Sequence, residues 1–180
     1  MSPHRRIAAC LLTIAWASAC VHAEDTQRLN RGNDPFFSIS QAVAHCPEPL
    51  GPLETDSEWR AESHWRVERG NSCWWEGRCR LSNGYFYDKE IAEAVRRRLA
   101  NIEPATHWKE KTTLWLMLQR RFVYVQGCIA PGFDKKTFLA ELAKTADVER
   151  VIDDTVDDAA GKLPYRTLAN PDVLPTDSSE

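Results

Sequence analysis

The sequence predicts an α+β fold, a two-layer sandwich in which two helices cover one face of a three-stranded mixed sheet in the order α-β-β-α-β. Three observations predict it: two segments with apolar residues three or four apart, two segments in which apolar residues alternate, and a final short apolar run. All of them lie within residues 86–156. A 180-residue chain that is 43% hydrophobic and 27% charged can bury one ordinary core, which excludes a large multidomain enzyme.

The first residues predict export. Arg5 and Arg6 precede an apolar run from Ile7 to Ala19, and small residues follow it, so residues 1–23 are expected to be a signal peptide that is removed. The run is too short to span a bilayer, and no transmembrane segment is expected in the mature chain. In an alternative processing, cleavage before Cys20 would leave a lipid-anchored protein.

The mature chain keeps four cysteines, an even number that is typical of an oxidising compartment. Three pairings are open. We favour Cys73 with Cys79, because the Glu76-Gly77 pair can turn a short loop, and this leaves Cys46 to pair with Cys128. A metal site is the alternative, but the cysteine spacing lacks the two-residue gap of zinc knuckles, so we expect neither metal nor cofactor.

Residues 24–85 form an N-terminal extension with irregular and helical parts. Phe36 to Val43 is expected to contain one short helix between turn-forming prolines. A longer helix is predicted from Asp56 to Arg69, capped by Thr55 or Asp56 and stopped at Gly70. A loop with two cysteines and two tryptophans then leads into the sandwich.

The first helix of the sandwich begins at Asp88 as its cap and ends at Pro104. Its apolar residues recur at three or four positions, which is the stripe of one buried face: Ile91, Val95, Leu99 and Ile102. The second helix is capped by Asp134, and its stripe comprises Phe138, Leu142 and Ala146.

Alternation predicts two paired strands, Thr113 to Leu118 and Phe122 to Gly127. The turn between them, residues 119–121, contains no glycine. Val148 to Val156 is the last strand, and its connection from the preceding strand through the second helix should be a right-handed parallel crossover. Residues 157–180 are expected to be a flexible acidic tail.

Residues 86–156 resemble the BON domain, a small module of bacterial osmotic-stress, outer-membrane and nodulation-specificity proteins. The resemblance rests on the element order and on three segments: the helix from Asp88 to Leu99, the strand Val123-Tyr124-Val125-Gln126-Gly127, and the closing Ala146-Asp147-Val148-Glu149-Arg150-Val151. The chain departs from the family in its glycine-free turn and in Asp147, where a glycine is common. A single copy is present.

The resemblance implies a non-enzymatic envelope module that binds a phospholipid surface or an envelope protein. Residues 88–150 hold twelve Lys and Arg against nine Asp and Glu, although the whole chain has a net charge of −3. Near an anionic bilayer each basic residue contributes about 1 kcal/mol, so a convergent group would bind lipid. The candidates for lipid contact are Arg96, Arg97, Arg98, Arg120, Arg121, Lys135 and Lys136. The near-neutral balance gives no reason to expect nucleic acid.

Two adjacent tryptophans, Trp74 and Trp75, lie between Cys73 and Cys79. We expect them to pack as core around a disulfide, since large aromatic side chains gain most by burial. The alternative is an exposed aromatic knob that binds a protein partner, as in a small scaffold or inhibitor-like module. An enzyme is the third hypothesis, because the three histidines of the mature chain are scattered and none lies in a nucleophile motif.

Overall fold

The computed structural model describes residues 27–175, so the predicted signal peptide and the alternative lipid anchor at Cys20 lie outside the described residues. The fold is α+β, as predicted. Its elements are β1 (Phe36–Ser38), α2 (Asp56–Trp75), the 3₁₀ helix η1 (Gly84–Tyr87), α3 (Asp88–Thr106), α4 (Trp108–Lys111), β2 (Thr112–Gln119), β3 (Phe122–Ile129), α5 (Lys135–Ala143) and β4 (Arg150–Val156).

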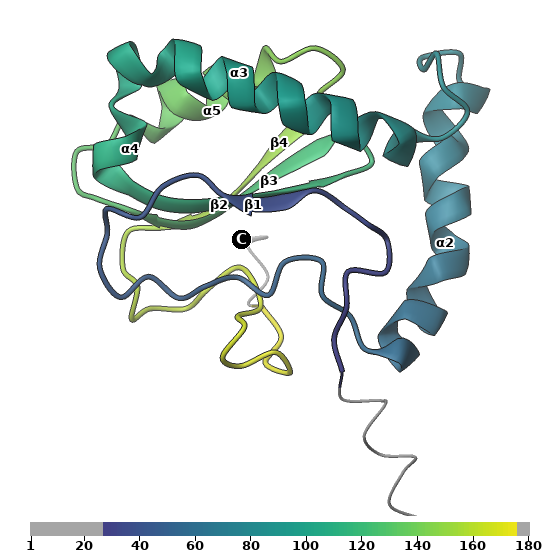
Figure 1. Cartoon of the computed structure of the whole chain (residues 1–180), viewed down its shortest axis with the longest axis horizontal. Helices are drawn as coiled ribbons and strands as arrows, with labels where there is room; N and C mark the ends of the chain where they lie inside the picture. Colours follow the sequence, from purple (N-terminus) through teal and green to yellow (C-terminus); the bar gives the residue numbers. More distant parts are fainter. Residues whose placement is uncertain (1–26, 176–180) are drawn as a thin grey trace, which may run out of the picture.

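The four strands form one mixed sheet in the order β1-β2-β3-β4 (Figure 1). β2 and β3 are an antiparallel hairpin, β3 and β4 are parallel, and α5 connects those two, as the sequence predicts. The prediction of three strands misses β1, which pairs antiparallel with β2 in a segment where we expected a short helix. A three-residue strand is too short for alternation to distinguish it from a helix.

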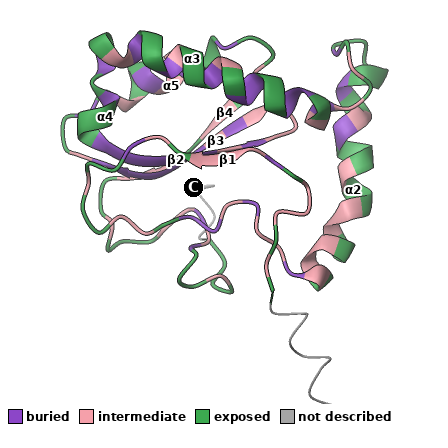
Figure 2. Ribbon diagram, in the orientation of Figure 1, coloured by how far each residue is buried: buried purple, intermediate pink, exposed green. Residues whose placement is uncertain are grey.

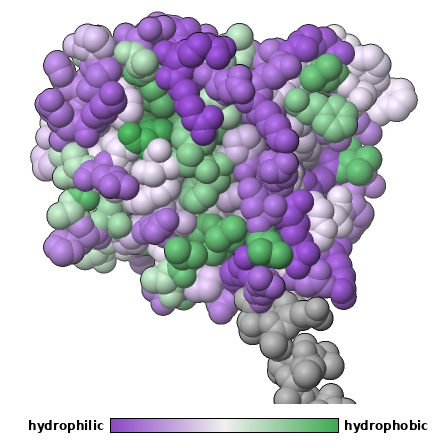
Figure 3. All heavy atoms as spheres, in the orientation of Figure 1, coloured by the Kyte–Doolittle hydropathy of each residue, from purple (hydrophilic) through white to green (hydrophobic). Residues whose placement is uncertain are grey.

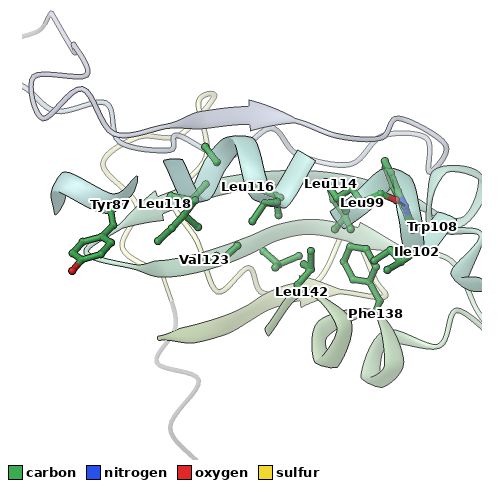
Figure 4. Packing of buried hydrophobic residues seen from close by; sticks show 14 of the residues in the cluster. Tyr87, Leu99, Ile102, Trp108, Leu114, Leu116, Leu118, Val123, Phe138 and Leu142 are labelled. Carbon is green, nitrogen blue, oxygen red and sulfur yellow. Dashed lines mark hydrogen bonds between the residues drawn. The ribbon is translucent and has the colours of Figure 1, made fainter. Parts of the chain in front are cut away.

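The main core lies between the sheet and the layer of α3 and α5 (Figure 1). The predicted stripe of α3 is buried, and α5 contributes Phe138 and Leu142. The inclusion of Ala146 in the second stripe is wrong, because α5 ends at Ala143 and Ala146 is exposed. Figure 4 shows these side chains meeting residues of β2 and β3 that point to the same face. On the strands they meet Leu114, Leu116, Leu118, Val123 and Val125, each fully buried.

The opposite face of the sheet is covered by two irregular segments, residues 39–55 and 157–175 (Figures 1 and 2). They are joined by a bridge between Pro49 and Thr167 and by a hydrogen bond from the N–H of Leu50 to the carbonyl of Arg166 at 2.7 Å. The part of the tail that the structure describes therefore has backbone hydrogen-bond partners in the segment before α2, and the flexibility of residues 157–180 stays a prediction.

Two predicted helix ends are wrong. α3 continues through Pro104 and ends at Thr106, and its C-cap residue His107 has a left-handed φ of 50°. α2 has the predicted cap, since Thr55 and Glu58 form a capping box, but it continues past Gly70 to Trp75. A Cβ at Gly70 would lie 2.2 Å from the side-chain oxygen of Asn83, so this glycine permits close packing and does not stop the helix.

Candidate functional site

The β2–β3 turn consists of two arginines. Gln119 pairs with Phe122, which leaves Arg120 and Arg121 as the turn residues, with φ of 54° and 69°. Two-residue hairpin turns favour positive φ, which costs an arginine more than a glycine. Asp88 offsets this cost, because its carboxylate accepts the backbone N–H groups of both arginines at 2.7 Å. The turn contains no glycine, and its backbone is fixed by a residue of α3.

Asp88 does not act as the predicted helix cap. α3 begins at Asp88 itself, and Tyr87 precedes it without a side-chain cap. Asp88 is 2% exposed, and this burial raises its pKa to about 7, although the two N–H donors act in the opposite direction. The carboxyl group therefore belongs to the hairpin turn and titrates near neutral pH.

The seven basic residues proposed for lipid contact do not form one group. Arg120 and Arg121 lie before β3, whereas Lys135 and Lys136 begin α5, which follows the other end of β3. The eight residues of β3 separate the two pairs by roughly 23 Å. The arginines of residues 96–98 lie within α3, in the layer above the sheet (Figure 1).

Most of these cations also have partners. Arg98, Arg121 and Lys135 form salt bridges with Glu141, Glu149 and Asp153, in that order. Arg96 lies over the ring of Phe37 and Arg120 over that of Phe122. Arg97 and Lys136 are exposed. The convergent basic face that lipid binding needs is not assembled by these residues.

Both favoured disulfides are present. Cys46 and Cys128 are bonded with their Cα atoms 5.7 Å apart, and Cys73 and Cys79 are bonded with theirs 5.3 Å apart. The first attaches the irregular lead-in to β3, and the second attaches the end of α2 to the loop before η1. This second disulfide is shielded from solvent, since Cys73 and Cys79 are 4% and 8% exposed.

Trp74 and Trp75 do not pack around that disulfide, which corrects our expectation. Trp74 is 45% exposed and Trp75 is 78% exposed. The face of α2 that packs against the rest of the protein carries Gly70 and Cys73, the two buried residues of this helix. Successive helix residues are turned by about 100°, so the two residues that follow Cys73 point away from that face.

Further apolar side chains are exposed on α2 and on η1. Val67 lies seven residues before Trp74, hence on the same side of α2, and is 61% exposed; Phe86 of η1 is 63% exposed. Hydrophobic residues are visible over α2 and the segment that follows it in Figure 3, among mainly hydrophilic neighbours. We name Val67, Trp74, Trp75 and Phe86 the α2 apolar surface.

A groove of about 460 Å³ lies beside this surface and is lined by both Val67 and Phe86. Its floor contains a salt bridge between Arg66 of α2 and Asp34, in which the guanidinium donates two hydrogen bonds at 2.6 and 3.0 Å. Asp34 also accepts a hydrogen bond from Gln119 at 2.6 Å. Sequence reasoning did not find this link, because nothing in the spacing of 32 residues signals it.

A second cavity, of about 380 Å³, lies on the other side of Arg66. We name it the tyrosine pocket. Burial raises the pKa values of Glu54, Tyr85 and Tyr124 in its wall. The side chains that matter below come from α2, η1, the β2–β3 turn, β3 and the segment before α2: Glu54, Glu58, Glu62, Tyr85, Arg120 and Tyr124.

Within residues 27–175 no three His, Cys, Asp or Glu side chains lie together in a way that could hold a metal ion. In the same part of the chain, no helix has both the length and the apolar character needed to cross a membrane. Comparisons with protein-family models, curated proteins and solved structures found no match to this chain.

Proposed function

We propose that this protein is an exported, non-enzymatic binding module of the cell envelope that docks on a protein partner through the α2 apolar surface. The exposure of Trp75, at 78%, carries the proposal. An indole left in water adds little to the stability of its own domain, whereas tryptophan is among the residues that contribute most at protein interfaces. Trp74 and Phe86 extend the surface on the same helix and on the adjoining turn.

The two disulfides support the proposed compartment. Two disulfides in a small chain are consistent with an oxidising, exported environment. Periplasmic location is the proposal that agrees with the predicted signal peptide, with a lipid anchor at Cys20 as the variant form. The order α3, β2, β3, α5, β4 and the parallel β3–β4 pair support a BON-like core, to which α2 is added.

The charges around the α2 apolar surface favour a protein over an anionic lipid. Three arginines near the end of α2 are paired with acids on the protein itself: Arg69 with Glu62, Arg78 with Glu76, and Arg80 with Glu90. An anionic bilayer attracts unpaired cations, and paired ones add little. A partner with an apolar recess and a neutral rim complements this surface.

Photo-crosslinking in the native cell envelope tests the proposal. A photoreactive phenylalanine derivative replaces Trp75, and a matched control carries it at Ala100, an exposed residue of α3. We expect a discrete protein adduct from position 75, absent at position 100 and lost when Trp74 is also changed to Ser.

A pelleting assay with anionic vesicles tests the competing hypothesis that the partner is a lipid surface. If no protein adduct forms at position 75, and the purified protein pellets with anionic vesicles in a salt-dependent way, the binding partner is a phospholipid surface and the proposal is wrong. The Arg96→Gln/Arg97→Gln variant would then lose pelleting, since these are exposed arginines of α3.

A further inference from the structure

The tyrosine pocket contains polar groups that the protein leaves without hydrogen-bond partners among residues 27–175. Glu54, Tyr85, Tyr124 and Arg120 all line it, and their polar groups are a carboxylate, two hydroxyls and a guanidinium. None of these four groups forms a side-chain hydrogen bond or a salt bridge within that range, although each residue is only partly exposed. A ligand that supplies hydrogen-bond partners for such partly buried polar groups binds more favourably.

The other charges in the wall are already neutralised. Glu58 accepts hydrogen bonds from Arg28 and Arg166, and Glu62 pairs with Arg69. Arg66 pairs with Asp34, so that among residues 27–175 the charged groups of this wall without a salt bridge are Glu54 and Arg120. The pocket therefore presents one charge of each sign, with two phenol rings in the same wall.

The backbone at Arg120 is held in place by a residue of α3. Its φ of 54° is in the region that disfavours residues with a Cβ, and Asp88 holds its N–H. The side chain of the other turn residue, Arg121, contacts Glu149 and the carbonyl of Asp147, so it has a structural task. The Arg120 side chain has none beyond its contact with the ring of Phe122.

We propose that the tyrosine pocket binds a small zwitterion, an amino acid or a short peptide with free ends. Arg120 receives the carboxylate of the ligand and Glu54 its ammonium group, while Tyr85 and Tyr124 flank the atoms between them. A volume of about 380 Å³ is sufficient for a dipeptide. This site is separate from the α2 apolar surface, and its existence does not depend on the proposed docking function.

Calorimetric titration of the purified mature protein tests the site with four probes. These are L-alanyl-L-alanine, its N-acetyl derivative, its C-terminal amide, and the neutral disaccharide sucrose. We expect the free dipeptide to bind with a Kd of about 1 mM or below. Blocking either end removes a charge-assisted hydrogen bond and should weaken binding about tenfold or more, and sucrose should not bind.

Two variants assign the ends of the ligand. Arg120→Gln should abolish the preference for a free carboxylate, so that the dipeptide and its amide bind equally weakly. Glu54→Gln should abolish the preference for a free amine in the same way. Arg97→Gln, at an exposed position of α3, is the control and should bind like the unmodified protein. Arg120→Lys, which retains the charge, should recover part of the binding.

Three results would overturn the assignment. The first is no binding of the dipeptide at about 10 mM. The second is equal binding of the free and blocked dipeptides, and the third is tighter binding of sucrose than of any peptide. A thermal melt of each variant shows whether it is folded, so a loss of binding in a folded Arg120→Gln protein reports on the site. If the tyrosine pocket binds no dipeptide, the crosslinking result expected at position 75 is unchanged, so the two proposals can fail separately.

Discussion

Asp88 should make the stability of the protein depend on pH in a way that one substitution removes. Its carboxyl group titrates at about 7 in the fold, against 3.8 for an unperturbed aspartate. The folded state therefore binds this proton more tightly than the unfolded state, and the free energy of unfolding falls as the pH rises from about 4 to about 7. At 1.36 kcal/mol for each pH unit, the loss is on the order of 4 kcal/mol.

Asp88→Asn is the informative change. The amide retains one acceptor for the two turn N–H groups, so the variant should be less stable than the unmodified protein at low pH, by about 2 kcal/mol. It cannot ionise, and it escapes the loss that the carboxyl suffers near neutral pH. The stability difference between the two proteins should therefore shrink or reverse as the pH rises toward 8.

Urea unfolding at a series of pH values measures that difference. Groups other than Asp88 titrate alike in both proteins, so their effects cancel. Asp157→Asn, at an exposed site, is the control and should follow the unmodified protein at every pH. A difference between Asp88→Asn and the unmodified protein that stays constant from pH 4 to pH 8 would refute the reasoning.

Four other substitutions have predicted effects on unfolding. Cys46→Ser opens a loop of 82 residues and should cost about 4.5 kcal/mol, whereas Cys73→Ser opens one of 6 residues and should cost about 2 kcal/mol; similar costs in urea unfolding would contradict the loop-entropy account. Gly70→Ala should cost about 1–2 kcal/mol, because the new Cβ displaces the Asn83 side chain that caps η1; a stabilised variant would show that this contact is loose. Trp75→Ser should change stability by no more than about 0.5 kcal/mol, and a large drop in Tm would mean that the indole is packed.

The elements with strong periodicity could be predicted from sequence. The α3 stripe and the alternation in β2 and β3 are repeated over at least five residues each, and one buried face suffices to explain them. The disulfides were also predictable, since a short loop with a glycine limits the pairing. These features depend on near neighbours in the chain.

The parts that sequence did not predict depend on contacts between distant segments. The Asp34–Arg66 salt bridge joins residues 32 apart, and Glu54 and Arg120 reach one pocket from segments that share no motif. The exposure of Trp75 depends on which face α2 turns inward, and that face is held by Gly70 against Asn83, by the Cys73–Cys79 disulfide and by the Arg66–Asp34 salt bridge. A helix with so few apolar residues carries no stripe from which that face could be read.

The docking function is tested most directly by oxidative footprinting of tryptophan in purified protein and in the intact cell envelope. Trp75 should be among the most readily oxidised tryptophans of the purified protein, and Trp108, which is 4% exposed, should be protected. In the envelope, oxidation of Trp74 and Trp75 should fall several-fold, while oxidation of Trp65, which is 44% exposed and lies outside the α2 apolar surface, should be unchanged. Equal oxidation of Trp75 in both preparations would contradict the account, because it would show that nothing covers the α2 apolar surface.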